Sequence, residues 1–137
     1  MRIRRLTKRA NLFLQSMLLV GVLALILPIA PVMAEESLQE RVRSYWTARS
    51  SNDLHTLYNL ESAARPGGWL TPDQYQRIGG LPVREVEIVD TKIDGDRAEV
   101  KLQGQVAVGS LGWVPQQLTQ QWVKIDGKWY HQTPAPR

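Results

Sequence analysis

The chain has 137 residues, with 17 basic and 13 acidic side chains, no cysteine and two histidines. The lack of cysteine excludes disulfides, thiolate metal sites and cysteine nucleophiles. His55 and His131 are too few for a histidine-rich metal site, so we expect neither a metal nor another cofactor.

Residues 1–34 have the pattern of a cleavable signal peptide. Five basic residues and no acidic one precede the uncharged apolar run over residues 17–27. As a helix this run rises about 16 Å, short of the roughly 30 Å of a bilayer's hydrocarbon core. Pro28 and Pro31 end the helix, because proline lacks an amide hydrogen and clashes with the preceding turn.

The segment Val32-Met33-Ala34 places small residues at the two positions that a signal peptidase reads. We therefore predict cleavage between Ala34 and Glu35, export by the general secretory route, and a single periplasmic or extracellular domain over residues 35–137. The alternative is an uncleaved leader that anchors the domain in the inner membrane. In that case the leader is the only part that we expect to contact a membrane.

The leader also changes the meaning of the net charge. The whole chain has a net charge of +4, but removing the five basic residues of the leader leaves 12 basic against 13 acidic residues, a net charge of −1. A basic surface is the electrostatic feature on which nucleic-acid binding depends. We therefore expect no nucleic-acid partner.

Capping residues and apolar spacing predict three helices after the leader. Ser37 and Glu40 form a capping box for a helix over residues 37–50. The break at 51–53 begins a second helix, and Thr71, followed by proline and by a glutamine three residues on, begins a third that ends at Gly79-Gly80.

From Leu81 onward the apolar period changes to two, as in strands. Asp94-Gly95 and Asp126-Gly127 lie between alternating segments, which is the strongest short-range hairpin signal. The apolar parity shifts near Ile88–Val89, and a β-bulge there would absorb the shift. With two-residue loops, the expected pairs are Val89 with Val100, Thr91 with Ala98, Val123 with Tyr130, and Trp122 with His131.

Together these elements predict an α+β fold. Three N-terminal helices pack on a curved antiparallel four-stranded sheet, which is made of two Asp-Gly hairpins.

Three segments carry a family resemblance: Val42-Arg43-Ser44-Tyr45-Trp46, the Asn52-Asp53 break before Leu57-Tyr58, and the closing segment over residues 122–130. With this order of elements the chain resembles the SnoaL-like, or nuclear-transport-factor-two-like, superfamily of cone-shaped α+β domains. The resemblance implies a pocket between sheet and helices. It implies a fold rather than a reaction, because the superfamily includes isomerases, dehydratases and non-catalytic modules.

All five tryptophans follow the leader. The second hairpin would place Trp122, Trp129 and His131 on one sheet face, and tryptophan suits half-wet binding surfaces. We therefore predict a ligand-binding surface that also includes a flap carrying Trp113; its residues are Trp46, Tyr58, Trp113, Trp122 and Trp129. The alternative is that Trp122 and Trp129 are core residues and that Trp113 pins a wide hairpin connection.

His131 is a weak catalytic candidate, because a polar group beside the aromatic Trp122 suits acid–base chemistry. A plain surface histidine is the alternative. Asp53 and His55 do not form a comparable pair, since side chains two residues apart on a helix do not face each other.

The leading functional hypothesis is an exported, non-catalytic domain. It binds a small apolar or amphipathic ligand, or a protein partner, through the tryptophan-rich sheet face. Two alternatives stay open: a small isomerase- or lyase-like enzyme with His131 or a pocket carboxylate as acid or base, and a structural module that forms a homodimer through the sheet.

Overall fold

The computed structural model describes residues 36–136. The predicted leader and its cleavage site lie outside the described residues. Within residues 36–136, no helix is long and apolar enough to cross a membrane.

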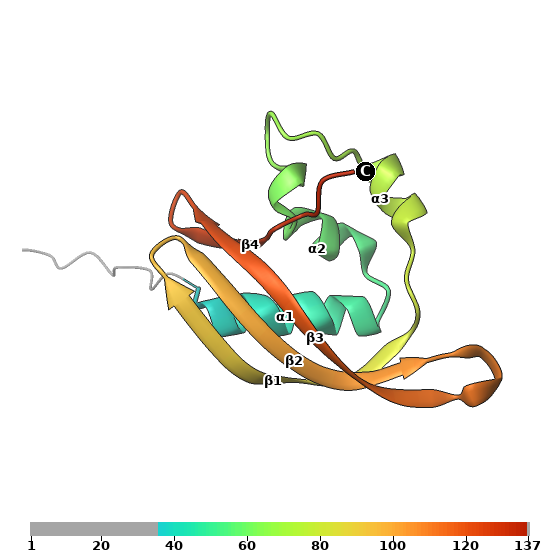
Figure 1. The fold of residues 1–137 in the computed structure, drawn as a ribbon. Coiled ribbons are helices and arrows are strands. Elements are labelled where there is room, and N and C mark those ends of the chain that lie inside the picture. Colours follow the sequence, from blue (N-terminus) through green and yellow to red (C-terminus); the bar gives the residue numbers. More distant parts are fainter. Residues whose placement is uncertain (1–35, 137) are drawn as a thin grey trace, which may run out of the picture. The chain divides into compact units, whose positions relative to one another are not determined.

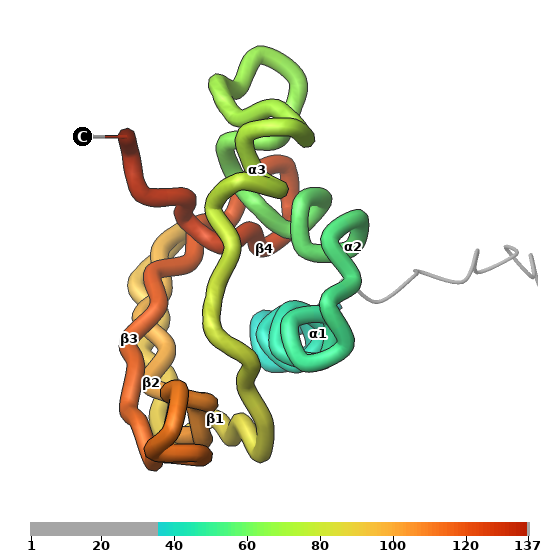
Figure 2. Tube along the Cα trace, turned by 90° about the vertical axis from the view of Figure 1, so that its right-hand side faces the viewer, coloured from blue at the N-terminus to red at the C-terminus, as the bar shows by residue number. Residues whose placement is uncertain are grey.

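The fold is α+β, with helices that precede an antiparallel sheet of strand order β1-β2-β3-β4 (Figure 1). The helices are α1 (Leu38–Ser50), α2 (Leu54–Asn59) and α3 (Pro72–Ile78), with short 3-10 turns at Ser62–Ala64 and Gly109–Leu111. The strands are β1 (Val83–Asp94), β2 (Arg97–Ala107), β3 (Trp113–Ile125) and β4 (Lys128–His131). Figure 2 shows α1 lying against one face of the sheet, which we call the inner face.

The capping signals predict the helix starts correctly. The Ser37 hydroxyl accepts a hydrogen bond from the amide of Glu40, and the Glu40 carboxylate accepts one from the amide of Ser37. Thr71 and Gln74 form the same reciprocal pair at the start of α3. These bonds satisfy amides that have no partner within the helix.

The second hairpin has the predicted register, with Val123 opposite Tyr130 and Trp122 opposite His131. Its loop residues Asp126 and Gly127 both have positive φ angles, of 49° and 78°. This is the conformation that a two-residue type I′ turn requires.

The first hairpin forms, but its predicted register is wrong by two residues. Thr91 lies opposite Val100 and Ile93 opposite Ala98, so Val89 does not face Val100 and Thr91 does not face Ala98. The loop is Gly95-Asp96 rather than Asp94-Gly95, with φ +57° at Gly95. Glycine at the first loop position is typical of a type II′ turn. A shift of two residues leaves every side chain on its predicted face.

Strand β1 carries the predicted β-bulge and a second irregularity. The register shifts between Ile88 and Asp90, which leaves Val89 without a direct partner. A further shift falls between Arg84 and Glu87, where Glu85 has a φ angle of +52°. Extra residues in one strand bend it and increase its twist. The two bulges therefore give β1 the curvature that was expected of the sheet.

The core lies between α1 and the inner face. Helix α1 packs against β1, β4 and α2, and α2 packs against α3. The largest fully buried side chains are Val42, Leu57, Val100 and Trp122. Trp129 is also buried within this cluster. The core therefore contains both tryptophans of the second hairpin.

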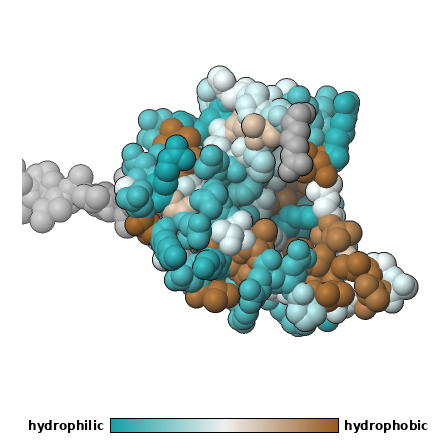
Figure 3. Space-filling view, in the orientation of Figure 1, coloured by the Kyte–Doolittle hydropathy of each residue, from teal (hydrophilic) through white to brown (hydrophobic). Residues whose placement is uncertain are grey.

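The inner face continues beyond the part that α1 covers. Leu118 on this uncovered part is exposed, and Leu111 and Trp113 are exposed at the tip of the β2–β3 hairpin. Figure 3 shows apolar residues gathered at this end of the molecule.

Candidate functional site

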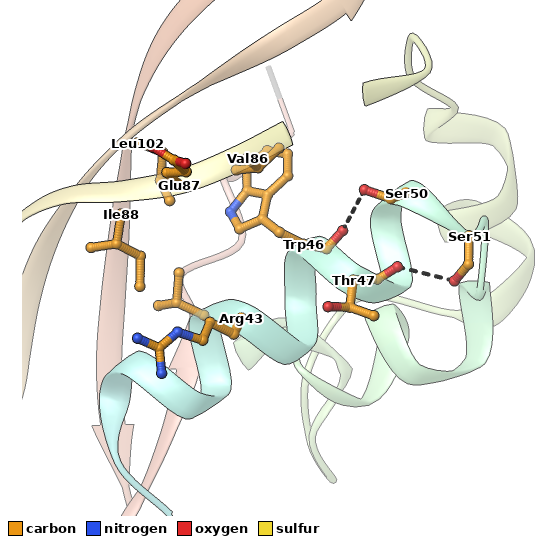
Figure 4. A pocket seen from close by; sticks show the side chains of 10 residues that line it. Arg43, Trp46, Thr47, Ser50, Ser51, Val86, Glu87, Ile88 and Leu102 are labelled. Atoms are coloured by element: carbon orange, nitrogen blue, oxygen red, sulfur yellow. Dashed lines mark hydrogen bonds between the residues drawn. The ribbon is translucent and has the colours of Figure 1, made fainter. Parts of the chain in front are cut away.

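A cleft of about 770 Å³ lies between α1 and strand β1. Figure 4 shows its side chains, which come from α1 and its C-terminal cap and from strands β1 and β2. Its lining residues are Val42, Arg43, Trp46, Thr47, Ser50, Ser51, Val86, Glu87, Ile88 and Leu102. The apolar members of this set come from α1 on one side and from β1 and β2 on the other.

A second, smaller cleft of about 210 Å³ follows the uncovered part of the inner face. It shares Trp46, Val86 and Leu102 with the first cleft, so the two meet around the Trp46 indole. Gln116 and Leu118 of β3 form part of its wall. The two clefts offer one continuous, largely apolar surface that has Trp46 at its centre.

The Trp46 ring is held by a buried amide. Its Nε1–H donates to Oε1 of Gln120 at 3.0 Å, and the Nε1–H of Trp122 donates to the same oxygen at 3.3 Å. Gln120 lies on the inner face and is itself buried. Because the indole N–H already has an acceptor, the remaining ring surface of Trp46 is apolar and suited to stacking or hydrophobic contact.

Two charged side chains lie at the rim of the larger cleft. Arg43 is exposed, and its side chain forms no hydrogen bond or ion pair with the described residues. Glu87 accepts a long hydrogen bond of 3.4 Å from Gln103. The rim therefore has a guanidinium group that no described side chain pairs, and it can bind an anionic group on a ligand.

The structure does not bring the five predicted binding residues together. Trp46 lines both clefts, whereas Trp122 and Trp129 pack in the core. The Tyr58 hydroxyl donates to the Leu70 carbonyl at 2.8 Å, and the Arg84 guanidinium covers the ring of Trp113 at 4.2 Å. The contact with Arg84 agrees with the interpretation in which Trp113 pins the hairpin connection.

His131 lies beside Trp122, as the hairpin register predicts, with ring centroids 5.8 Å apart. Its Nδ1 lies 2.9 Å from Oε2 of Glu61, a carboxylate that the sequence analysis did not single out. Glu61 is only 2% exposed. One feature of the sequence could have indicated this site. Glu61 is a single acidic residue in a segment with Leu60, Ala63 and Ala64, and such an apolar segment is typical of a buried position.

Three hydroxyl groups complete the surroundings of this carboxylate. Thr133 Oγ1 donates to Glu61 at 2.8 Å, Tyr75 Oη at 3.3 Å and Tyr45 Oη at 3.4 Å. Together with the His131 imidazole they form what we call the Glu61 cluster. Its members come from α1, α3, β4 and the C-terminal tail, so one carboxylate joins four segments of the chain.

The Glu61 cluster perturbs its two tyrosines. Burial raises the pKa of Tyr45 far above its ordinary value, and the negative charge of Glu61 adds to the shift. The same two causes, in the same order, raise the pKa of Tyr75. Both effects disfavour a second negative charge at this place.

This perturbation predicts a loss of stability at alkaline pH. The unfolded chain ionises its tyrosines near pH 10, whereas the folded chain keeps Tyr45 and Tyr75 neutral above that value. Their contribution to stability is therefore complete below about pH 10 and is lost as the pH rises further. We expect urea midpoints measured from pH 8 to pH 11 to fall less steeply for Tyr45→Phe than for the natural chain. Equal slopes would contradict the assignment.

An imidazole held by a carboxylate through Nδ1 can act as a general base through Nε2. The Nε2 of His131 has no hydrogen-bond partner among the described residues. Neither cleft around Trp46, however, is lined by Glu61 or His131. The Glu61 cluster and the clefts are thus separate features, and the catalytic role of His131 stays a prediction.

Asp53 and His55 have separate partners. Asp53 caps α2 and accepts hydrogen bonds from the hydroxyl and the amide of Thr56, which lower the pKa of its carboxyl. His55 Nε2 lies 3.2 Å from the Asn59 amide nitrogen. In the part of the chain that the structure describes, no group of three acidic or histidine side chains is arranged to hold a metal ion.

No protein-family model matches the sequence, and no curated protein matches it. A SEC-C motif containing protein from Rhodopseudomonas palustris has a similar structure, with a TM-score of 0.56, 17% identity, and coverage of 71% of this chain and 76% of that one. A second, from Psychrobacter arcticus, has a TM-score of 0.59 and 15% identity over 75% of this chain. The chain spans 62% of the length of the Psychrobacter protein.

An NTF2-like transpeptidase from Campylobacter jejuni matches with a TM-score of 0.49 and 16% identity, over 72% of this chain and all of that one. At identities this low a structural likeness shows the fold alone. The chain therefore shares an α+β fold with the two SEC-C motif containing proteins.

Proposed function

We propose that this protein is an exported, non-catalytic binding domain that takes a small amphipathic ligand into the cleft around Trp46. The observation that carries the proposal is the cleft between α1 and β1. It has one fixed indole at its centre and, at its rim, one arginine whose side chain has no partner among residues 36–136. The proposal includes the export that the composition of residues 1–34 predicts, and a place in the SnoaL-like superfamily.

The size and lining of the cleft support a small organic ligand. Its volume of about 770 Å³ falls within the range of about 300–1,000 Å³ that is usual for small-molecule sites. Val86, Ile88 and Leu102 face Trp46 across it. Such sites combine apolar walls with a few polar groups that set the orientation of the ligand.

The rim indicates which polar group the ligand carries. A guanidinium group binds carboxylate, sulfonate or phosphate oxygens, and Arg43 has no competing partner among the described residues. Glu87 is the acidic side chain on the opposite wall, and it would repel an anionic group placed beside it, so such a group would lie on the Arg43 side of the cleft. We infer an apolar body that lies against Trp46 and an anionic head that lies near Arg43.

This proposal relocates the binding surface that the sequence predicted. Trp122 and Trp129 belong to the hydrophobic core, where they pack with residues of α1. Trp46, in contrast, is half-buried and lines the cleft. Of the five predicted binding residues, Trp46 is therefore the one that this proposal retains as the main ligand contact.

Binding can be measured with 8-anilinonaphthalene-1-sulfonate, a fluorescent probe that has an apolar ring system and a sulfonate. We expect the full-length expressed protein to bind it, and Trp46→Ala to weaken binding by roughly tenfold, the effect of losing about 1.4 kcal/mol of contact. The matched control is Trp69→Ala, because Trp69 is exposed and lines neither cleft. An equal loss in both variants, or no binding by the natural chain, would overturn the proposal.

Competition separates the apolar contact from the charged one. Decanoate should displace the probe at lower concentration than decanol, and Arg43→Gln should remove that preference while the affinity for decanol stays the same. Arg97→Gln serves as the control, since Arg97 is an exposed arginine at the start of β2 that lines neither cleft. If decanol competes as well as decanoate in the natural chain, the anionic head group is wrong.

A further inference from the structure

More than half of strand β3 is an open sheet edge. Strand β2 pairs with β3 along its whole length, from Trp113 to Val123, whereas β4 pairs only with Trp122–Ile125. Residues 113–120 therefore have no strand on their other side within the described part of the chain. An edge of this kind presents a row of unpaired backbone groups that can pair with another strand.

The backbone groups that face this edge can be identified. The carbonyl of Gln121 accepts a hydrogen bond from the amide of Gln132, on the side of β4. Because alternate residues of an antiparallel strand direct their backbone groups to opposite sides, those of Gln117 and Thr119 also face the open edge. Pro115 has the same parity, and proline is tolerated in a strand where its missing N–H would face outward.

The other edge of the same sheet is protected in ways that β3 is not. Six of the twelve residues of β1 are charged, and β1 has two register irregularities. Residues 102–123, by contrast, contain no charged side chain, although the chain as a whole is 22% charged. Charged residues and bulges are the usual devices that prevent edge-to-edge pairing. Along the exposed part of β3 only Pro115 acts in this way, at one end.

We propose that the open edge of β3 pairs with β3 of a second copy of this chain, which makes one continuous eight-stranded sheet. An uncharged strand is compatible with itself, because no like charges meet when two identical edges approach. A two-fold axis beside Leu118 places Leu118 opposite the partner's Leu118. The N–H and carbonyl of Gln117 then bond to the carbonyl and N–H of the partner's Thr119. The two-fold axis repeats these two bonds between Thr119 and the partner's Gln117.

Side chains alternate between the two faces along β3, and this alternation places the two-fold axis beside a residue rather than between two residues. Even-numbered residues of β3, such as Leu118 and Gln120, lie on the inner face, because Trp122 does. Residues that oppose each other across a sheet must share a face, so odd and even positions cannot pair. Leu118 is 43% exposed in one copy, and the contact with its counterpart covers apolar surface. It also closes one side of the smaller cleft, whose wall includes Gln116 and Leu118.

A single-cysteine variant tests this arrangement, since the natural chain has no cysteine. In the proposed register the two Cα atoms at position 118 are about 4.5 Å apart, within the range of about 4.4–6.8 Å that disulfides span. Leu118→Cys should therefore form a disulfide-linked dimer rapidly under mild oxidation. Val89→Cys, 55% exposed on the protected edge strand, should not. Equal cross-linking of the two variants would overturn the proposal.

Sedimentation of the reduced, natural protein supplies an independent readout. We expect a concentration-dependent dimer, which Gln117→Lys dissociates by placing two like charges at the paired edges. Gln103→Lys is the matched control, because Gln103 lies directly opposite Gln117 on the interior strand β2. At a protein concentration of about 1 mM, an association free energy of only about 4 kcal/mol is enough to form a dimer. A monomeric mass at every concentration up to that value would therefore refute the dimer. A complex that forms only with an unrelated protein would refute it as well.

Discussion

Replacement of Glu61 by alanine is expected to lower the free energy of unfolding by about 3–5 kcal/mol. Small domains unfold with about 5–15 kcal/mol, so this change removes a large part of the total. The Glu61 carboxylate is buried and accepts hydrogen bonds from His131, Thr133, Tyr45 and Tyr75. Alanine leaves these donors without their acceptor and opens a cavity, and a buried donor without a partner is costly.

Urea denaturation followed by tryptophan fluorescence measures this effect. Glu61→Gln keeps the size of the side chain and one acceptor oxygen, so we expect an intermediate loss. Glu87→Ala removes an exposed carboxylate and should change stability by at most about 0.5 kcal/mol. If Glu61→Ala unfolded at nearly the same urea concentration as the natural chain, the Glu61 cluster would not be the structural hub described above.

The same variants separate a structural role of Glu61 from a role in ligand binding. A structural hub predicts that Glu61→Ala weakens binding of the fluorescent probe only as far as it unfolds the domain. The reason is that Glu61 lines neither cleft. At urea concentrations where both proteins are folded, the affinity should be unchanged.

Trp122→Ala is expected to be the second strongly destabilising change, by about 3–5 kcal/mol. Trp122 is 0% exposed and lies in the buried cluster to which α1, α2, β2, β3 and β4 contribute. Its removal leaves a large cavity and takes one of the two indole N–H donors from Gln120. Urea midpoints at neutral pH measure the loss.

The control for Trp122→Ala is Trp113→Ala. Trp113 is 39% exposed, and its ring is covered by Arg84, so its loss should cost about 1 kcal/mol or less. A small effect at Trp122 together with a loss of probe binding would instead assign that tryptophan to a ligand site. The pair of variants therefore decides between the two roles that the sequence analysis left open for the second hairpin.

Local chemistry in the sequence determined much of this fold. A capping box needs only residues three apart, so Ser37 with Glu40 and Thr71 with Gln74 located two helix starts. The register of the second hairpin followed from Asp126-Gly127, because both residues accept the positive φ angles of a type I′ turn. The bulge at Val89 was likewise visible as a change of apolar parity.

The register of the first hairpin, in contrast, was decided by the tertiary structure, because two turns are close in energy there. Asp94-Gly95-Asp96 permits a turn over its first two or its last two residues, since glycine suits either position. The observed choice pairs Asp94 with Arg97 and sets Ile93 against Ala98. No residue inside the turn distinguishes the two registers, so packing along the whole hairpin selects one.

The candidate site depended almost entirely on contacts between distant segments. Glu61 is recognisable as a hub only once α1, α3, β4 and the tail converge on it, and nothing within a few residues of it indicates those partners. The sequence alone does not show which of Trp46, Trp122 and Trp129 are buried. Which of them is covered depends on where α1 crosses the sheet and on how far the inner face extends beyond it. The sequence therefore determined the elements, because their signals are local, whereas the tertiary structure decided which side chains are buried and which remain available to a ligand.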